Sequence, residues 1–292
     1  RKTFPPSWHF LKLECIKNFQ NLLLFSKINL YNYKNGETRM SNIEKLKNEL
    51  IEQRKTKFPG NIYNVTQVLF AYNSNKIEGS RLTEDQIEMI FETGSFIAKN
   101  HDVIKADDIT EAVNHFRLFD YILDTIDKPL TKEMIIEMNK IIKRGTSDEF
   151  NPRYNVGGFK VLPNVIGLTN VIKTSRPENV EKDINDLLFE YENRRNINIE
   201  DIIDFHLKFE RVHPFGDGNG RVGRAIMFKE CLRKNIVPFV ILDQHKAYYL
   251  RGLREYDRDK NFLIDTCLNE QDIYKDLCKQ LLNMNFENGK TR

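Results

Sequence analysis

The 292-residue sequence has no paired-cysteine motif, no long apolar run and no large excess of charge of one sign. Its four cysteines never show the Cys-x-x-Cys spacing of zinc or redox sites, so we expect reduced thiols in a cytoplasmic protein. The apolar run at residues 22–25 is far shorter than the roughly 20 residues that a membrane-spanning helix needs. A formal net charge of +3 with 30% charged residues indicates a solvated surface. We therefore expect neither a membrane nor nucleic acid as a partner.

The chain also lacks internal repeats and low-complexity tracts, and helical apolar patterns recur with short breaks from about residue 42 to residue 284. With 40% apolar residues it can bury a substantial core. The pattern predicts one all-α domain over residues 40–292, with a C-terminal helix at about 260–284. Residues 1–39 precede Met40, which looks like an ordinary start followed directly by a helix. We expect that first segment to be an extension, either disordered or helical.

Residues 213–224 read His-Pro-Phe-Gly-Asp-Gly-Asn-Gly-Arg-Val-Gly-Arg and are the most informative part of the chain. The glycines on both sides of Asn219 allow a tight turn, and the residues from 221 onward have a helical pattern. Such a turn at a helix N-terminus directs backbone N–H groups toward an anion. Arg221 and Arg224 are spaced i and i+3 on the first turn, so both side chains can reach one polyphosphate.

Two other groups in this run can take part in chemistry. His213 has an ordinary pKa near ~6.5 and can accept a proton from a hydroxyl at neutral pH. Asp217 would repel phosphate on its own, so its expected role is to hold Mg²⁺ between phosphate oxygens. Taken singly, a histidine near a Pro-Phe turn is more often a packed residue, and Gly-Asn-Gly is more often a plain turn. The joint spacing favours a phosphate site with a general base attached.

This run resembles the signature of Fic-domain proteins, H-x-F-x-D/E-G-N-G-R-x-x-R, at every specified position. The resemblance implies an all-helical Fic fold with its core at about 107–257, and transfer of AMP from ATP to a Ser, Thr or Tyr hydroxyl of a protein. The implied roles are general base for His213, Mg²⁺ ligand for Asp217, anion hole for Gly218, Asn219 and Gly220, outer-phosphate clamps for Arg221 and Arg224, and core anchor for Phe215.

A second stretch, at about 62–79, has a helical pattern that ends at Gly79. By itself Glu78 is a solvated carboxylate at a helix end that Gly79 caps. The stretch is similar to the inhibitory-helix motif of the Fic family, S/T-x-x-x-E-G/N, which Ser74, Glu78 and Gly79 match. The resemblance implies that Glu78 pairs with Arg224 in the place of the γ-phosphate of ATP and restrains the enzyme.

Residues 151–168 combine glycine, proline and β-branched residues, which predicts a short β-hairpin. In Fic proteins a hairpin flap at this place lines the nucleotide and holds the target segment by backbone pairing. The resemblance therefore assigns Val156, Gly157, Gly158 and Phe159 to the nucleotide wall.

Two adjacent tyrosines, Tyr248 and Tyr249, lie in a predicted helix at residues 243–256. From the residues alone they are packing groups, whereas the resemblance places such a pair against the nucleotide base. Tyr256 stands where many Fic proteins have an asparagine, so the preference for adenine is less well determined than phosphate binding. His206, on the apolar stripe of residues 198–212, is predicted to be a core histidine rather than a metal ligand.

Other functions would use the same residues. Some Fic proteins with the inhibitory glutamate remove AMP, with that glutamate positioning a water, and other relatives transfer other phosphate-containing groups. A nucleotide-sensing regulator is a further alternative, although it would not need the base His213. A homodimer that hides or frees the inhibitory helix is a hypothesis that the resemblance raises.

Overall fold

The computed structural model describes residues 41–56, 58–98, 103–166 and 172–286. The chain divides into two compact units, Arg1–Ser41 and Asn42–Arg292, and every helix and strand below belongs to the second unit. The predicted extension over residues 1–39 lies outside the described residues.

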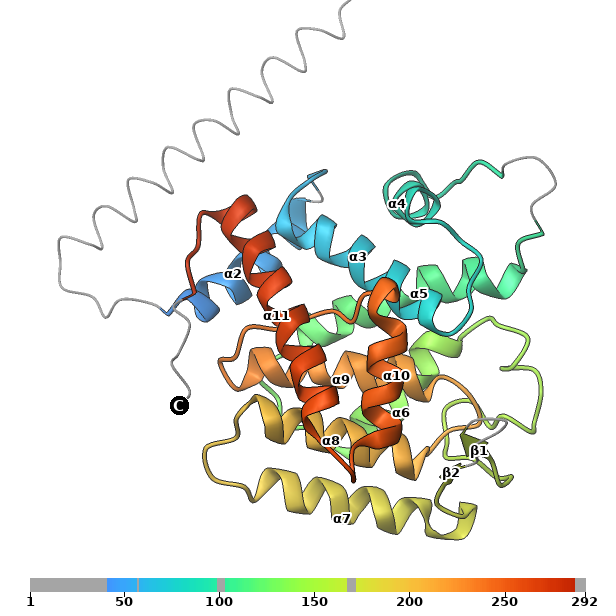
Figure 1. The fold of residues 1–292 in the computed structure, drawn as a ribbon. Helices are drawn as coiled ribbons and strands as arrows, with labels where there is room; N and C mark the ends of the chain where they lie inside the picture. The colour runs from blue at the N-terminus through green and yellow to red at the C-terminus, as the bar shows by residue number, and fades with distance from the viewer. Residues whose placement is uncertain (1–40, 57, 99–102, 167–171, 287–292) are drawn as a thin grey trace, which may run out of the picture. The chain divides into compact units, whose positions relative to one another are not determined.

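The second unit is built almost entirely from helices, which confirms the predicted all-α fold (Figure 1). No helix in the described ranges is long and apolar enough to cross a membrane. The elements in chain order are α2 (Asn42–Thr56), α3 (Ile62–Ile77), α4 (Glu84–Thr93), α5 (Ala106–Asp124), α6 (Lys132–Lys143), β1 (Val165–Ile166), β2 (Ile172–Lys173), η1 (Pro177–Asn179), α7 (Val180–Glu192), α8 (Ile199–Val212), α9 (Asn219–Arg233), η2 (Asp243–His245), α10 (Lys246–Glu255) and α11 (Asn261–Leu282).

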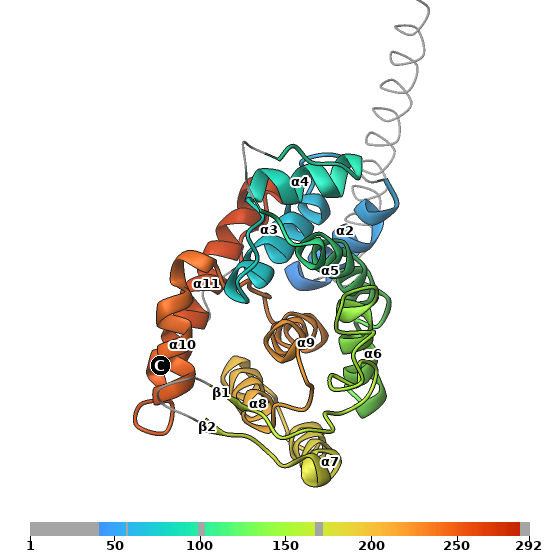
Figure 2. The same cartoon turned by 90° about the vertical axis from the view of Figure 1, so that its right-hand side faces the viewer.

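Helix α9 is the centre of the fold. Every one of its residues except Gly220 and Arg233 is buried, as expected for a helix covered on all sides. It contacts α3, α5, α6 and α8, and Figure 2 shows it nearly end-on among these neighbours. Because the 213–224 run leads directly into α9, the fold anchors this run to a helix that is buried on all sides.

Helix α8 immediately precedes that run. It begins with a capping box in which the Asn198 side chain accepts from Asp201 N–H and the Asp201 side chain accepts from Asn198 N–H. Its apolar stripe is buried, and so is His206, which is fully inaccessible to solvent. The helix ends at His213, whose φ of +50° places it in the left-handed region. The side chain of His213 is thereby turned out of the helical register.

The predicted hairpin forms later in the chain than the sequence indicated. Strands β1 and β2 pair antiparallel, with Val165 opposite Lys173 and Ile166 opposite Ile172. Residues 156–159 lie before the strands: Val156 and Gly157 form a turn, Gly158 is a bend, and both Asn155 and Gly157 have positive φ. The Asn-Gly cluster thus folds into turns, and β-branched residues further on form the strands.

Phe215 is expected to be a main support of this region, because it is fully buried and packs against Phe159 and Phe209. Replacing it with alanine should lower the free energy of unfolding by about 3–5 kcal/mol, the usual cost of an emptied phenylalanine site. Chemical denaturation measures this change. Phe189→Ala is the control, since Phe189 is 73% exposed and its loss should cost less than about 0.5 kcal/mol. Equal effects of the two substitutions would contradict the packing described here.

Candidate active site

The loop between α8 and α9 is closed by the side chain of Asn219. Its Oδ1 accepts from Phe215 N–H at 2.9 Å, and its Nδ2 donates to Phe215 O at 3.0 Å. A side chain at Gly216 would be blocked, because a Cβ there would lie 2.9 Å from Tyr154 Cα and O. The Asn219 side chain is therefore a structural brace, and only its backbone N–H is available to a ligand.

The N-terminus of α9 is shaped to receive an anion. The cap residue Gly218 has a φ of +85°, and no side chain in the described part of the chain caps the first turn. The first N–H groups of a helix have no partner within the helix and carry the positive end of its dipole. The N–H groups of residues 219–221 therefore form an anion site of the kind that binds phosphate.

A cleft of about 190 Å³ lies beside this helix end. Apolar side chains of Ile77, Ile166, Leu207, Leu250 and Leu253 form part of its wall. Its polar lining includes Glu78, Glu210, His213, Arg224 and Tyr249. One cleft thus joins a titratable base, a guanidinium and apolar surface, which is the combination expected of a nucleotide site.

His213 is placed in this cleft as a neutral base. Its Nδ1 lies 3.2 Å from the backbone oxygen of Glu210, an interaction in which Nδ1–H donates. The other ring nitrogen, Nε2, then carries the free lone pair. Burial lowers the pKa of His213 to about 4, and the positive charge of Lys160 acts in the same direction. The imidazole is therefore unprotonated at neutral pH, as a general base must be.

Arg224 is held by the end of α3, far away in the sequence. Its Nη2 donates to Glu78 Oε1 at 2.7 Å and to Ser74 O at 2.9 Å, and its Nε donates to Ser74 Oγ at 3.1 Å. Burial would raise the pKa of Glu78, but Arg224 and Arg221 outweigh it and lower that pKa. Glu78 is the C-cap of α3 and is followed by Gly79 at a φ of +98°. The structure thus brings Ser74 and Glu78 to the arginine that the sequence indicated.

Arg221 faces away from this cleft, toward a group of carboxylates. It pairs with Glu111 at 2.5 Å and with Asp217 at 2.6 Å, and it is 2% exposed. Lys143 Nζ lies among Asp217, Glu111 and Asp148 at 2.5–2.6 Å. No sequence pattern indicated Lys143 or Glu111, because both come from helices outside the 213–224 run.

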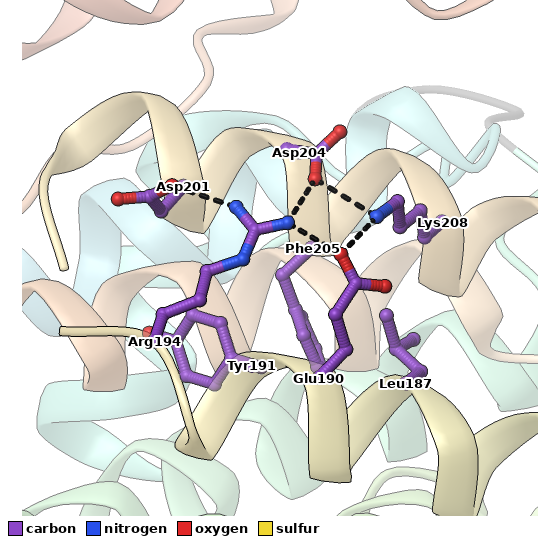
Figure 3. A pocket seen from close by; sticks show the side chains of 8 residues that line it. All are labelled: Leu187, Glu190, Tyr191, Arg194, Asp201, Asp204, Phe205 and Lys208. Carbon is purple, nitrogen blue, oxygen red and sulfur yellow. Dashed lines mark hydrogen bonds and ion pairs between the residues drawn. The ribbon is translucent and has the colours of Figure 1, made fainter.

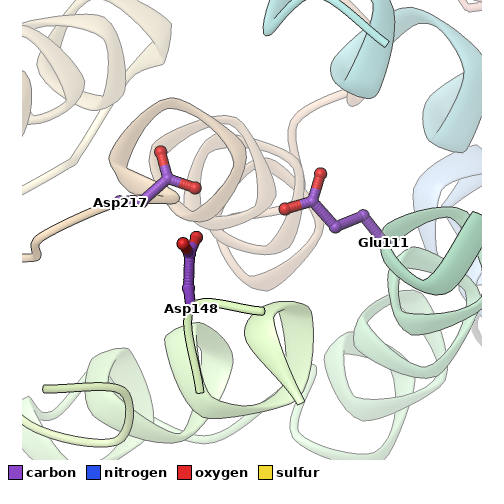
Figure 4. A group of neighbouring side chains, drawn as sticks. All are labelled: Glu111, Asp148 and Asp217. Carbon is purple, nitrogen blue, oxygen red and sulfur yellow. The ribbon is translucent and has the colours of Figure 1, made fainter. Parts of the chain in front are cut away.

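The three carboxylates of Glu111, Asp148 and Asp217 lie close enough to share a cation (Figure 4). The interior of the group is taken by Lys143, so it does not form an open three-carboxylate cage for a metal. Asp217 differs from the other two because its side chain is 41% exposed, against 13% for Glu111 and 18% for Asp148. Mg²⁺ is commonly held by one or two carboxylates together with substrate phosphates. Asp217 fits that role as a single protein ligand.

Residues 129–231 match the model of the Fic/DOC family. This stretch of the chain is a Fic/DOC-family domain. A protein of Nematostella vectensis named protein adenylyltransferase Fic is 27% identical over 192 residues, which are 63% of this chain and 42% of that protein. Protein adenylyltransferase fic-1 of Caenorhabditis elegans is 24% identical over 196 residues, 64% of this chain and 36% of its own length. This chain therefore spans less than half the length of these curated relatives.

Solved structures show the same fold. A Fic-domain-containing signaling protein from Bacteroides thetaiotaomicron superposes with a TM-score of 0.62 at 22% identity, over 80% of this chain and 92% of that one. At this identity the likeness establishes the fold alone. The helical Fic fold expected from the 213–224 run is thereby confirmed.

The flap of this Fic domain contributes a different residue to the cleft from those predicted. Ile166 of β1 lines the cleft, whereas Phe159 packs against Phe215 and Gly157 lies against the Lys140 side chain. Val156 and Gly158 belong to the same turns and are not among the lining residues of the cleft. Among the described residues of the flap, Ile166 of β1 is therefore the one that lines the cleft.

A buried lysine fastens the flap to the Fic motif. Lys160 is 3% exposed, and its Nζ donates to Asn164 Oδ1 at 2.6 Å, to Thr174 Oγ1 at 2.8 Å and to Val212 O at 3.3 Å. Burial lowers its pKa to about 8. Since Val212 immediately precedes His213, this ammonium ties both ends of the hairpin to the position of the base.

Only one member of the tyrosine pair enters the site. Tyr249 is buried, lines the cleft and shares a hydrogen bond of 2.7 Å with His206 Nε2. Tyr248 is 61% exposed and lies beside His245 instead, because adjacent residues of a helix point about 100° apart. His206 is a core residue with a hydrogen-bonding partner, as predicted. Tyr256 packs against the main core.

A second group of charges lies between α7 and α8, away from the Fic motif (Figure 3). Arg194 bonds to Glu190, Asp201 and Asp204, and Lys208 bonds to Glu190. The side chains fill the space between the helices, so this network holds α7 on α8 and leaves no room for a ligand.

Proposed function

We propose that this Fic domain transfers AMP from ATP to Ser, Thr or Tyr hydroxyls of target proteins and of the chain itself. One observation carries the proposal: the unprotonated His213 and Arg224 line a single cleft beside the uncapped N-terminus of α9. The relatives from Nematostella and Caenorhabditis, named as protein adenylyltransferases, support the same reaction.

Each residue of the site has a separate role in the proposed reaction. The target oxygen attacks the α-phosphorus, the bond from that phosphorus to the bridging oxygen breaks, and pyrophosphate leaves. His213 Nε2 takes the proton of the hydroxyl while Nδ1–H stays on Glu210 O. The N–H groups at the start of α9 stabilise the negative charge on the transferring phosphate. Arg224 binds the outer phosphates, and Arg221 holds Asp217 in place.

Asp217 would hold Mg²⁺ in this site. When bound, Mg²⁺ neutralises phosphate charge and orients the leaving group. Asp217→Asn should weaken the binding of Mn²⁺, used as a probe together with ATP, by about tenfold or more. Asp148→Asn is the matched control, since it also removes a partner of Lys143 but lies in the more buried part of the cluster. Equal losses in the two variants, measured by calorimetry, would rule out the ligand role of Asp217.

Glu78 restrains this activity in the proposal. It occupies Arg224, so the γ-phosphate of ATP cannot use the same guanidinium. Because Glu78 and His213 line one cleft, removal of AMP by a water that Glu78 positions is the second candidate function. Release of AMP from a pre-modified target by the wild type, and not by Glu78→Gly, would favour removal.

Mass spectrometry of the intact protein tests the group that is transferred. The Glu78→Gly variant is incubated with Mg²⁺ and, separately, with ATP, GTP, CTP or UTP. The proposal expects a mass increase of one AMP, largest with ATP. An increase with another nucleotide only would mean that the same site transfers a different nucleotidyl group. The comparison is needed because Tyr256 stands where many Fic proteins have an asparagine.

A further inference from the structure

Glu210 places a second carboxyl group in the cleft, one that the proposed reaction does not use. It is a residue of α8, is 9% exposed and lines the cleft together with Glu78, His213 and Arg224. Its Oε2 lies 3.9 Å from His213 Nδ1, while its Oε1 is buried and has no hydrogen-bond partner in the described residues. A buried carboxyl group without a partner is costly, so its place beside the base calls for a function.

The position of this carboxyl group is set by Gly223 on α9. A Cβ at Gly223 would lie 2.9 Å from Glu210 Oε1 and 2.8 Å from the His206 ring. The missing side chain therefore leaves the room in which the Glu210 and His206 side chains lie. His206 is in turn fixed by Tyr249 at 2.7 Å. Glu210 is thus held between the buried helix α9 and a histidine that is itself hydrogen-bonded.

The side chains of Glu78 and Glu210 both interact electrostatically with the guanidinium of Arg224. Arg224 forms its ion pair with Glu78, and its charge also acts on Glu210. Burial raises the pKa of Glu210 to about 8 despite Arg224, and the negative charge of Glu78 contributes to the rise. At neutral pH one carboxyl group is therefore ionised and the other protonated, which is the usual result when two acids share one site.

We propose that Glu210 is a positioning residue that couples Glu78 to His213: when Glu78 leaves the cleft, Glu210 ionises, becomes the anionic neighbour of Arg224 and stabilises the imidazolium form of His213. The Glu210 proton passes to solvent, and one negative charge replaces another beside Arg224. Departure of the inhibitory glutamate then also makes the base stronger. This inference rests on the proposed function, because it concerns the base of that reaction, but the measurements that test it do not require AMP transfer.

The other groups that face Glu210 keep their charge during this exchange. On α8, burial lowers the pKa of His206 to about 3, so its ring stays neutral. On α10, burial raises the pKa of Tyr249 above its usual range, so its hydroxyl stays protonated. Arg224 on α9 remains a cation. Among the groups that face the cleft in the described residues, Glu210 is therefore the one whose charge changes when Glu78 leaves.

The direction in which the pKa of His213 changes when Glu78 is removed shows whether Glu210 ionises. Glu78 raises the pKa of His213 through its negative charge, so removing Glu78 alone must lower that pKa. If Glu210 ionises 3.9 Å from Nδ1, the pKa of His213 rises instead, by at least about one unit for charges this close.

NMR titration of the imidazole groups in the nucleotide-free full chain measures this shift, with the His213 signal assigned from its loss in His213→Ala. We expect the pKa of His213 to rise by about one unit or more from wild type to Glu78→Gly. In Glu78→Gly/Glu210→Gln it should fall to the wild-type value or below. The matched control is Glu78→Gly/Glu270→Gln, which alters a buried carboxyl group that bonds to His245, and which should behave as Glu78→Gly. A pKa that falls or stays constant in Glu78→Gly overturns the inference.

A second measurement needs no substitution at Glu210. The side-chain carboxyl carbon of Glu210 is titrated in the wild type and in Glu78→Gly, where its pKa should fall from near 8 to below about 7. An unchanged value overturns the proposal even where Glu210→Gln does not fold. Neither titration uses ATP, so failure of AMP transfer would remove the proposed function and leave these results standing.

Discussion

Replacing Glu78 with glycine is expected to raise the initial rate of AMP transfer by about 10- to 100-fold. The Glu78 carboxylate holds Arg224 at 2.7 Å, and a hydrogen bond between charged groups is worth about 1.5–3 kcal/mol. Nucleotide phosphates must displace the Glu78–Arg224 contact in the wild type, whereas this contact is absent in Glu78→Gly. The rate is measured as label transferred from α-labelled ATP to protein at a fixed concentration of Mg²⁺.

The control for this change is Glu92→Gly, which removes an exposed glutamate from α4. That variant should transfer AMP within about twofold of the wild-type rate, since exposed substitutions change stability little. Glu78→Gln separates charge from shape, because it keeps the side-chain length and loses the ion pair. Equal rates in wild type and Glu78→Gly, with both proteins folded, would show that the contact with Arg224 does not restrain transfer.

Replacing His213 with alanine in the Glu78→Gly background is expected to lower transfer by about 10²- to 10⁴-fold, the usual contribution of a general base. Binding of ATP should change little, because the N-terminus of α9 and Arg224 remain in place. Transfer rate and ATP affinity are measured separately, by label incorporation and calorimetry. His245→Ala is the matched control, since His245 pairs with Glu270 and is not among the residues that line the cleft.

The pH dependence gives a further check on His213. Burial lowers its pKa to about 4, so the ring loses its proton as the pH rises through that value and is a base above it. Transfer in the wild type should therefore fall off only below about pH 5, not near the ordinary histidine value of ~6.5. Retention of full transfer in His213→Ala would contradict the assignment of the base more directly than any pH profile.

The parts of the site that sequence could predict are those that lie close together along the chain. The run from His213 to Arg224 contains its own turn, helix start and arginine, so its pattern shows the local geometry. Ser74 and Glu78 lie about 150 positions away from Arg224, and they were found only because their motif resembles that of a known family. The all-α fold followed from the helical spacing of apolar residues, which is a local property as well.

The parts that sequence could not predict depend on tertiary contacts. Lys143 and Glu111 meet Asp217 and Arg221 only after α5 and α6 pack beside α9. Turns and strands share similar residue types between residues 151 and 168, so the sequence indicated a hairpin but not that its strands begin at Val165. The buried carboxyl group of Glu210 has no sequence signal at all, because it reflects the room that Gly223 leaves on a different helix.

The decisive experiment for AMP transfer by this cleft compares α-labelled and γ-labelled ATP with Mg²⁺ in wild type, Glu78→Gly and Glu78→Gly/His213→Ala. Protein should take up label from the α position only, most strongly in Glu78→Gly and not measurably in the double variant. Label from the γ position would identify phosphoryl transfer instead. Equal α-label in Glu78→Gly and in the double variant would show that His213 is not the base of AMP transfer in this cleft.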